Sequence, residues 1–487
     1  MKVPKIFKNS AIYTIVTFLQ RCTAFLLLPL YTAFLTPADY GTVNVVLSVS
    51  SFMAVLIMVA LNGAATRLHY KNKEVGYRKK VWGTITTIVL VNSVFFGLLF
   101  ISFHGILVDP FIGDIDFYPY ALIALSYTII SPLYMLFQSY LQASQNAIHF
   151  GINTLINFLL QVGLTILFVV HYRMGALGLL SAYGITAFVF FIYVLTVFTP
   201  HLKFGIDKGI TRFSLRYSLP LLPHQISLWS AGTIDNLFLN GLKGKSVAGI
   251  YGIAQQFGSV VATISYSFNQ AFVPWFYELL EEGESGLKKI KQAGFCAVIS
   301  YCITAFALSV FSQEVLNIMV SENFREAHKI IPFVAFAFVF NGIYNLFVNV
   351  LLIDKTEYVF VATLSGMAVN IVLNILLIPH WGFYGCGIAC LMTYFVRSII
   401  ALILSLRKNK KIRYNYLSMY IMTFLFFACS LMIMHFLNRT SFLQFIIKIL
   451  VFILIVSVFL AKYYPVLKRI VIPSKVLKQK NNSYNEY

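Results

Sequence analysis

Apolar residues follow one another in stretches of about twenty, the length that a helix needs to cross a bilayer, and short polar segments separate these stretches. The pattern predicts about fourteen transmembrane helices, at residues 11–35, 43–65, 82–103, 119–141, 150–170, 177–198, 217–240, 247–270, 292–312, 330–352, 359–378, 384–406, 416–436 and 442–461. The first stretch is too long and too polar for a cleavable signal peptide, so we expect it to remain as the first helix. We therefore predict an all-α, polytopic membrane protein.

The composition supports a membrane protein. Of 487 residues, 59% are hydrophobic and only 11% are charged, a balance that a water-soluble surface does not tolerate. All six cysteines lie in apolar stretches, so we interpret them as packing residues rather than as a disulfide or zinc framework. No metal site and no cofactor are predicted.

The Lys and Arg residues predict the orientation of the chain in the membrane. With a cytoplasmic N-terminus, the predicted inner segments hold 28 of the 37 basic residues, as the positive-inside rule requires. Both termini are then cytoplasmic. Because topology and anionic headgroups account for the net charge of +20, the basic residues give no reason to expect nucleic acid as a partner.

Two parts of the chain resemble each other. Short matching segments recur at offsets of 207 to 210 residues: Tyr40-Gly41 with Ala248-Gly249, Tyr70 with Tyr277, Tyr134 with Tyr344, and Gly175 with Gly382. We predict a six-helix bundle at 1–200, a cytoplasmic linker at 201–216, a second six-helix bundle at 217–406, and two appended helices with a basic tail at 407–487. An even number of helices in each half makes the repeat parallel, and such halves can rock about a shared site.

Polar residues recur every three or four positions on several predicted helices, which places them on one helix face. The residues that we expect to line a hydrated cavity between the halves are Tyr13, Thr17, Gln225, Gln256, Tyr266, Asn341, Asn345 and Asn370. The alternative is that they join helices by interhelical hydrogen bonds, worth about 0.6 kcal/mol each on average.

Charged residues inside apolar stretches are the stronger signal, because they are costly in a bilayer and usually face a pathway or a partner. Arg21 lies near the middle of the first helix, so it contacts either an anionic ligand or an acidic residue. Arg397 lies in the inner half of its helix, where it could contact a ligand or extend to the headgroups. For Lys448 we expect extension toward the membrane surface.

Asp235 is the acidic residue that falls within a long apolar stretch. It could bind H+ or Na+ and couple that ion to movement, or it could pair with Arg21. His224, on the same helix, is either an interior histidine or a proton relay.

Several segments resemble the polysaccharide-repeat-unit flippases. They are LTPADYG at 35–41, YSLP at 217–220 with the run that leads to Asp235, AGIY at 248–251, Pro274, and GFYG at 382–385. These flippases belong to the superfamily that also holds the multidrug and toxin extrusion exporters and the lipid II flippase. The likeness covers about residues 1–410.

The resemblance implies a flippase of the bacterial cytoplasmic membrane. Such a protein moves an undecaprenyl-pyrophosphate-linked oligosaccharide from the inner to the outer leaflet for O-antigen, capsule or exopolysaccharide assembly. It also implies a cationic cavity, here Arg21 and Arg397, and an ion gradient, here acting on Asp235. Membrane lipids, a polysaccharide polymerase and chain-length machinery are the further partners that it suggests.

Two other functions are alternatives to this one. A cation-coupled multidrug exporter of the same superfamily usually has twelve helices and takes cationic drugs, which suit Arg21 poorly. An enzyme, such as a membrane glycosyltransferase, would use a DxD motif, which Asp114 and Asp116 match. That motif lies on the predicted outer side, where nucleotide sugars are absent, so we predict no catalytic residues and no enzyme.

Overall fold

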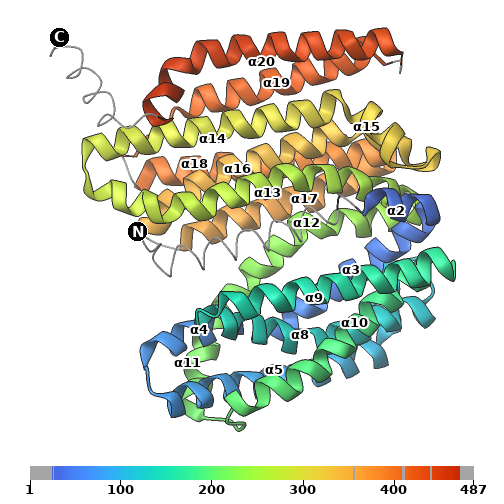
Figure 1. Ribbon diagram of the computed structural model, residues 1–487, viewed down its shortest axis with the longest axis vertical. Coiled ribbons are helices and arrows are strands. Elements are labelled where there is room, and N and C mark those ends of the chain that lie inside the picture. The colour runs from blue at the N-terminus through green and yellow to red at the C-terminus, as the bar shows by residue number, and fades with distance from the viewer. Residues whose placement is uncertain (1–24, 26, 355–356, 409–411, 439–440, 472–487) are drawn as a thin grey trace, which may run out of the picture. The chain divides into compact units, whose positions relative to one another are not determined.

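The computed structural model describes residues 25, 27–354, 357–408, 412–438 and 441–471, and all of their side chains except those of 354, 357 and 462–471 (Figure 1). The predicted cavity residues Tyr13, Thr17 and Arg21 therefore lie outside the described residues.

The described residues form helices and contain no strand. The α-helices are α2 (Leu28–Phe34), α3 (Pro37–Met58), α4 (Leu61–Lys71), α5 (Val75–Ser102), α6 (His104–Leu107), α7 (Asp109–Ile112), α8 (Leu122–Ala143), α9 (Ala147–Thr165), α10 (Gly175–Phe198), α11 (Lys208–Ser218), α12 (Leu222–Lys243), α13 (Lys245–Glu281), α14 (Glu284–Val310), α15 (Ser312–Met319), α16 (Ile331–Asp354), α17 (Glu357–Trp381), α18 (Phe383–Lys408), α19 (Tyr416–Phe436) and α20 (Phe442–Val471). Five short 3₁₀ or π segments connect some of them, at Phe117–Ala121, Ile166–His171, Thr199–His201, Leu219–Leu221 and Glu322–Lys329.

Twelve helical segments of the described residues are long and apolar enough to cross a membrane. They coincide with the predicted spans from 43–65 onward, except 217–240. That span is occupied by α12, whose 22 residues include His224, Gln225 and Asp235 and are more polar. The prediction of an all-α, multi-pass membrane protein is confirmed.

The chain divides into two compact units. Unit 1 contains the described residues up to Ile253, together with Met319–Glu326 and Gly366–Cys390. Unit 2 contains Ala254–Ile318, Ala327–Ser365 and the described residues from Leu391 onward. The predicted boundaries at 200, 216 and 406 stay a prediction, and each unit is described by itself.

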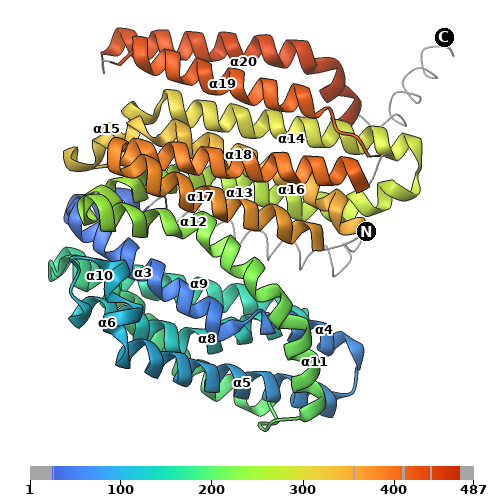
Figure 2. The ribbon, with the colours of Figure 1, turned by 180° about the vertical axis from the view of Figure 1, so that it is seen from behind.

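Unit 1 is built around α8 and α10, which lie side by side in both views (Figures 1 and 2). The adjoining helix α3 starts with a capping box that the LTPADYG segment encodes. Thr36 Oγ1 accepts a hydrogen bond from the Asp39 backbone N–H at 3.1 Å, and the Asp39 carboxylate accepts one from the Thr36 N–H at 3.0 Å. Pro37 supplies the first helical residue, where its missing N–H costs nothing.

Two glycines allow α3 and α13 to cross at backbone contact within unit 1. A methyl group on Gly41 would lie 1.8 Å from the Lys245 carbonyl oxygen, and one on Gly249 would lie 2.0 Å from the Pro37 carbonyl oxygen. Gly41 and Gly249 are equivalent in the predicted repeat, as are Pro37 and Lys245. The two close approaches are therefore reciprocal between these matched positions, and the parallel repeat stays a prediction.

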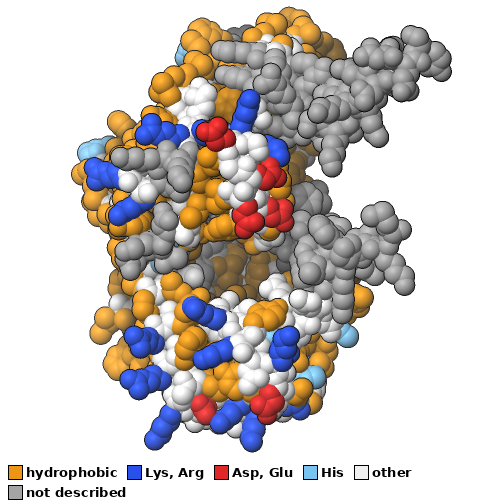
Figure 3. Space-filling model, turned by 90° about the vertical axis from the view of Figure 1, so that its left-hand side faces the viewer, with side chains coloured by type: hydrophobic (Ala, Val, Ile, Leu, Met, Phe, Trp, Pro, Cys, Tyr) orange, Lys and Arg blue, Asp and Glu red, His pale blue; other side chains and the backbone are white. Residues whose placement is uncertain are grey.

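Basic side chains gather on one face of unit 1, where α4, α5, α11 and the segment before α11 meet (Figure 3). Lys80 pairs there with Asp207 at 2.7 Å, and Lys79 Nζ donates to the Pro200 carbonyl oxygen at 2.9 Å. The charge pattern of the sequence predicts that this face is cytoplasmic.

Unit 2 contains α14, α16, α19 and α20, nearly all of α15, and most of α13 and α18. In Figures 1 and 2, α19 and α20 pack on the side of α14. Its core is rich in phenylalanine, and Phe306, Phe336, Phe340 and Phe426 are almost completely buried.

Candidate functional site

Asp235 on α12 is completely buried in unit 1. Its Oδ1 accepts hydrogen bonds from Nδ2 of Asn370 at 2.9 Å and from Nδ2 of Asn374 at 2.7 Å. The Tyr251 hydroxyl donates to Oδ2 at 2.8 Å. We call these four residues the carboxylate cluster.

The helices place these groups by simple spacing. Asn370 and Asn374 lie four residues apart on α17, so their side chains stack along one face, and Asn374 Nδ2 also donates to Asn370 Oδ1 at 3.2 Å. Tyr251 lies in the second turn of α13. Three helices therefore converge on a single carboxylate.

The carboxylate cluster contains no base. Among the described residues, no Lys, Arg or His pairs with Asp235, and its partners are two amides and a hydroxyl. A buried carboxylate that is held by neutral donors changes the local charge completely when a proton or a cation binds. The predicted alternative, a pair with Arg21, lies outside the described residues.

Arg397 is the second buried charge that the sequence singles out, and it lies on α18 in unit 2. Its guanidinium carbon is 3.8 Å from the centre of the Tyr344 ring and 5.9 Å from that of Tyr394. The residue is 5% exposed, and its Nε has no hydrogen-bond partner among the described residues. A guanidinium carries five N–H donors, so this one keeps unused hydrogen-bonding capacity among the described residues.

Asn341 and Asn345 lie close to Tyr344 along α16, and both are partly exposed. Helical spacing puts all three on neighbouring positions of one face. Two turns along, Asn349 donates to Asn269 Oδ1 at 2.8 Å, which is the interhelical contact that the alternative interpretation expects. On α13, Gln256 is half-buried and Tyr266 is exposed.

The structure separates His224 and Gln225 from the carboxylate cluster. His224 precedes Asp235 by eleven residues on α12, which corresponds to about 16 Å of helix. Both His224 and Gln225 are half-buried. The two predicted ion-coupling residues therefore do not form one site.

The expectation for Lys448 was wrong. Lys448 on α20 is 1% exposed, and its Nζ lies 2.6 Å from the Glu314 carboxylate on α15, both in unit 2. The short helix α15 places Glu314, an acid that lies outside any long apolar stretch, against the second turn of α20. A buried ion pair is a structural contact, so Lys448 remains outside the candidate site.

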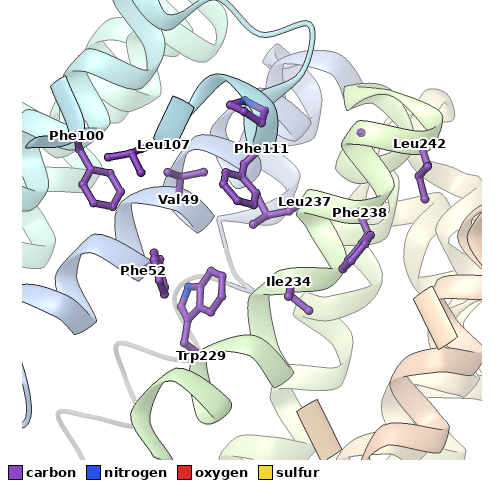
Figure 4. A pocket seen from close by; sticks show the side chains of 12 residues that line it. Val49, Phe52, Phe100, Leu107, Phe111, Trp229, Ile234, Leu237, Phe238 and Leu242 are labelled. Carbon is purple, nitrogen blue, oxygen red and sulfur yellow. The ribbon is translucent and has the colours of Figure 1, made fainter. Parts of the chain in front are cut away.

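Unit 1 also contains an apolar cavity of about 590 Å³ between α3, α5, α6, α7 and α12. The side chains around it come from all of these elements (Figure 4), among them Phe52, Phe100, Phe111, Trp229, Leu237 and Leu242. The Trp229 indole N–H donates to Ser51 Oγ at 2.9 Å and to the Ser48 carbonyl oxygen at 3.2 Å. The indole polar group is thus satisfied, and no charged side chain lines the cavity.

The sequence model of the polysaccharide biosynthesis protein family matches residues 6–280, more than half of the chain. The chain belongs to this family. The MatE family model also matches residues 220–376. The family resemblance drawn from the sequence is confirmed.

Relatives and solved structures agree with this assignment. A protein of the Lsg locus of Haemophilus influenzae is 23% identical over 330 residues, which cover 64% of this chain and 76% of that one. The lipid II flippase MurJ, in an inward closed conformation, has a TM-score of 0.75 at 15% identity, covering 94% of this chain and 100% of that one. The Vibrio cholerae MATE transporter VcmN has a TM-score of 0.54 at 15% identity, covering 83% and 97%. The chain therefore has the fold of these transporters.

Sequence reasoning found part of the carboxylate cluster. It named Asp235 and Asn370 as site residues, but Tyr251 entered only as part of the AGIY segment. The signal that could have identified Tyr251 was its position in the AGIY segment, which follows the predicted span that contains Asp235. No pattern of residues in one helix could link that hydroxyl to a carboxylate on the preceding helix.

Proposed function

We propose that this protein is a flippase that moves an undecaprenyl-pyrophosphate-linked oligosaccharide repeat unit from the inner to the outer leaflet by alternating access. The observation that carries the proposal is the match to the polysaccharide biosynthesis family on a chain with the fold of a lipid flippase. The protein would work in the bacterial cytoplasmic membrane, with both termini in the cytoplasm. Its glycan would enter O-antigen, capsule or exopolysaccharide, where a polymerase and chain-length machinery act next.

Arg397 is our candidate for recognition of the pyrophosphate. The planar guanidinium can donate two parallel hydrogen bonds to phosphate oxygens, and its charge offsets theirs. Tyr344 holds the guanidinium by a cation–π contact while leaving Nε without a partner. Arg21 is the second base that we assign to the phosphates.

Asp235 is our candidate for ion coupling, by H+ or by Na+. Tyr251, Asn370 and Asn374 fix the carboxylate from both of its oxygens, so a bound ion changes the charge of a rigid site. An ion can drive a transport step only if its affinity differs between the two conformations. Rearrangement of α12 against α17 would alter the donors and hence that affinity.

The apolar cavity of unit 1 supports a substrate with a hydrocarbon chain. Its lining offers no polar partner, so a polar ligand would lose its hydration there without compensation. An isoprenoid segment would gain contact with Phe52, Phe100 and Trp229.

The test is transport in proteoliposomes. The substrate is the lipid-linked glycan that accumulates in cells of the natural host that lack the protein, and the measurement is its access to an enzyme outside the vesicles. We expect transport that depends on a proton or Na+ gradient and is lost in Arg397→Met. Absence of any accumulated lipid-linked glycan in the deletion strain would contradict the proposal.

A second candidate function is a cation-coupled multidrug exporter, which the MatE match at 220–376 favours. Arg397 argues against it, because a buried guanidinium repels a cationic drug. Drug-resistance profiles of the same deletion strain separate the two candidates. A deletion that sensitises cells to cationic drugs and leaves surface glycan intact would favour the exporter.

A further inference from the structure

A second cavity of unit 1 has a more polar lining than the apolar one. It has a volume of about 200 Å³ and lies between α8, α9 and α10. Hydroxyl and amide groups from all three helices line it, and six of them belong to Tyr127, Ser131, Asn157, Gln161, Tyr183 and Thr186. No charged residue is part of the lining. We call it the polar bundle cavity.

Several of these polar groups lack a protein partner. Thr186 is only 3% exposed, and its hydroxyl makes no hydrogen bond among the described residues. Among the described residues, nothing donates to or accepts from the side chains of Ser131 and Asn157, and Gln161 lies near the Tyr183 hydroxyl. Buried polar groups are nearly always satisfied in native structures. The buried Thr186 hydroxyl therefore calls for a ligand or for water, and the half-buried Ser131 and Asn157 side chains can contact the same ligand.

The side chains that line the cavity recur at helical intervals along α8 and α10. Tyr127, Ser131 and Tyr134 lie four and three residues apart on α8, as do Tyr183, Thr186 and Phe190 at three and four on α10. Such intervals keep side chains on one face of a helix. Two polar, aromatic faces thus oppose each other, and Asn157 and Gln161 of α9 close the space between them.

Charge and polarity restrict what the cavity can hold. A phosphate or a cationic group would lose its hydration with no opposite charge to replace it. A hydrocarbon chain would leave the Thr186 hydroxyl and the Asn157 amide unsatisfied. The remaining class is a neutral molecule with many hydroxyl groups and some apolar C–H surface, which aromatic rings can cover.

The volume of the cavity limits the ligand further. Pockets for drug-sized ligands usually have volumes of about 300–1,000 Å³, and this cavity, at about 200 Å³, is smaller. It has room for one ring rather than for an oligosaccharide. A neutral hexose ring has this size, and its hydroxyls both donate and accept, as Tyr, Ser, Thr, Asn and Gln side chains do.

We propose that the polar bundle cavity binds one neutral sugar ring of the transported glycan and selects the glycan by that ring. This inference rests on the proposed flippase function and adds to it a residue-level site for the sugar. Tyr183 and Thr186 on α10 hydrogen-bond the ring from one side, and Tyr127 on α8 and Asn157 on α9 contact it from the others. None of these residues belongs to the carboxylate cluster or contacts Arg397.

The test compares two substrates in the same proteoliposomes. One is the complete lipid-linked glycan from the deletion strain, and the other is the same carrier lipid with only its first sugar phosphate. We expect the double variant Tyr183→Phe with Thr186→Val, which removes two hydroxyls and keeps the volume, to slow transport of the complete glycan about fivefold to tenfold per lost bond. Transport of the one-sugar lipid should change less than twofold.

A matched control removes a hydroxyl from the same helix outside the cavity. Tyr193 on α10 donates to Asn153 Oδ1 at 3.0 Å, and Tyr193→Phe should leave the ratio of the two substrates unchanged. Equal slowing of both substrates by the double variant would mean a structural role and would overturn the proposal, as would no slowing of either. Failure of the wild-type protein to move the complete glycan would instead contradict the flippase function.

Discussion

Asp235 in unit 1 and Arg397 in unit 2 are both buried charges in apolar helices, yet their surroundings differ in kind. Asp235 accepts three hydrogen bonds at 2.7 to 2.9 Å. Arg397 lies against two tyrosine rings, and its Nε has no partner. One charge is therefore already solvated by protein groups, whereas the other is oriented by aromatic rings and has an Nε donor without a partner among the described residues.

The difference predicts that the two charges contribute unequally to the stability of the folded protein and to transport. Hydrogen bonds to a charged group are worth about 1.5–3 kcal/mol each, so the carboxylate cluster should contribute to folding as well as to coupling. A cation–π contact contributes about 0.5–2 kcal/mol. Removing the Arg397 side chain should therefore cost little stability beyond that contact. Changes at Asp235 should therefore affect the folded state, and changes at Arg397 should affect transport.

The largest effect should come from Asp235→Ala. It leaves the Tyr251, Asn370 and Asn374 donors unpaired, and unpaired buried donors cost about 1–3 kcal/mol each. We expect a loss of stability of about 3–5 kcal/mol, measured by thermal unfolding in detergent. Asp235→Asn, which keeps the shape, should fold and transport without dependence on H+ or Na+ gradients. Unchanged gradient dependence in that variant would remove Asp235 as the coupling residue.

Lys448 and Glu314 provide a third buried charge with no assigned role in transport. Lys448→Ala leaves the Glu314 carboxylate unpaired, which should cost about 3–5 kcal/mol. The double change Lys448→Met with Glu314→Leu should restore most of that stability, because a buried pair is often replaceable by apolar side chains. Transport per folded molecule should stay at the wild-type level. A loss of gradient coupling in the stable double variant would instead place this pair in the mechanism.

Arg397→Met should reduce transport and leave stability nearly unchanged, in contrast to Asp235→Ala. The side-chain volume is kept and no hydrogen bond among the described residues is lost, so the unfolding temperature should change little. Transport should fall by about 10- to 100-fold, as expected for a lost charge-assisted contact to phosphate. Arg397→Lys keeps the charge without the planar fork and should give an intermediate rate. Full transport by Arg397→Met would contradict the assigned role.

Tyr344→Leu tests whether the ring orients the guanidinium. The cation–π contact at 3.8 Å should be worth about 1 kcal/mol, so we expect a rate loss of about fivefold with a slight loss of stability. Tyr344→Phe keeps the ring face and is the matched control. If Leu and Phe behave alike, the ring does not position Arg397.

The smallest effect should come from an exposed pair. Lys80 hydrogen-bonds Asp207 at 2.7 Å, and with the Ile210 backbone N–H it lowers the pKa of the Asp207 carboxyl below its usual value. Because this pKa is lowered on folding, the stabilisation is present above the usual carboxyl pKa and disappears as pH falls through the lowered one. Asp207→Asn should therefore shift the unfolding temperature slightly at pH 7, and by progressively less as pH falls below the usual carboxyl pKa. A shift that does not change with pH would exclude the charge as its cause.

The apolar stretches of the sequence were sufficient to predict the membrane class and the positions of most helices. Apolar stretches of sufficient length have only one way to satisfy their backbone groups in lipid, which is to form helices. The sequence also identified Asp235 and Arg397, because a charge within an apolar stretch is visible without any knowledge of neighbours. The glycines at 41 and 249 were visible as a repeat, although their contact was not.

Only the tertiary structure decided which partner each charge has. Tyr251, Tyr344 and Glu314 lie on helices other than those of the charges that they contact, so no spacing within a helix could link them. The polar bundle cavity likewise exists only where three helices meet, since each face alone looks like ordinary interhelical packing. Periodicity fixes which side of a helix a residue occupies, and packing alone fixes what lies opposite it.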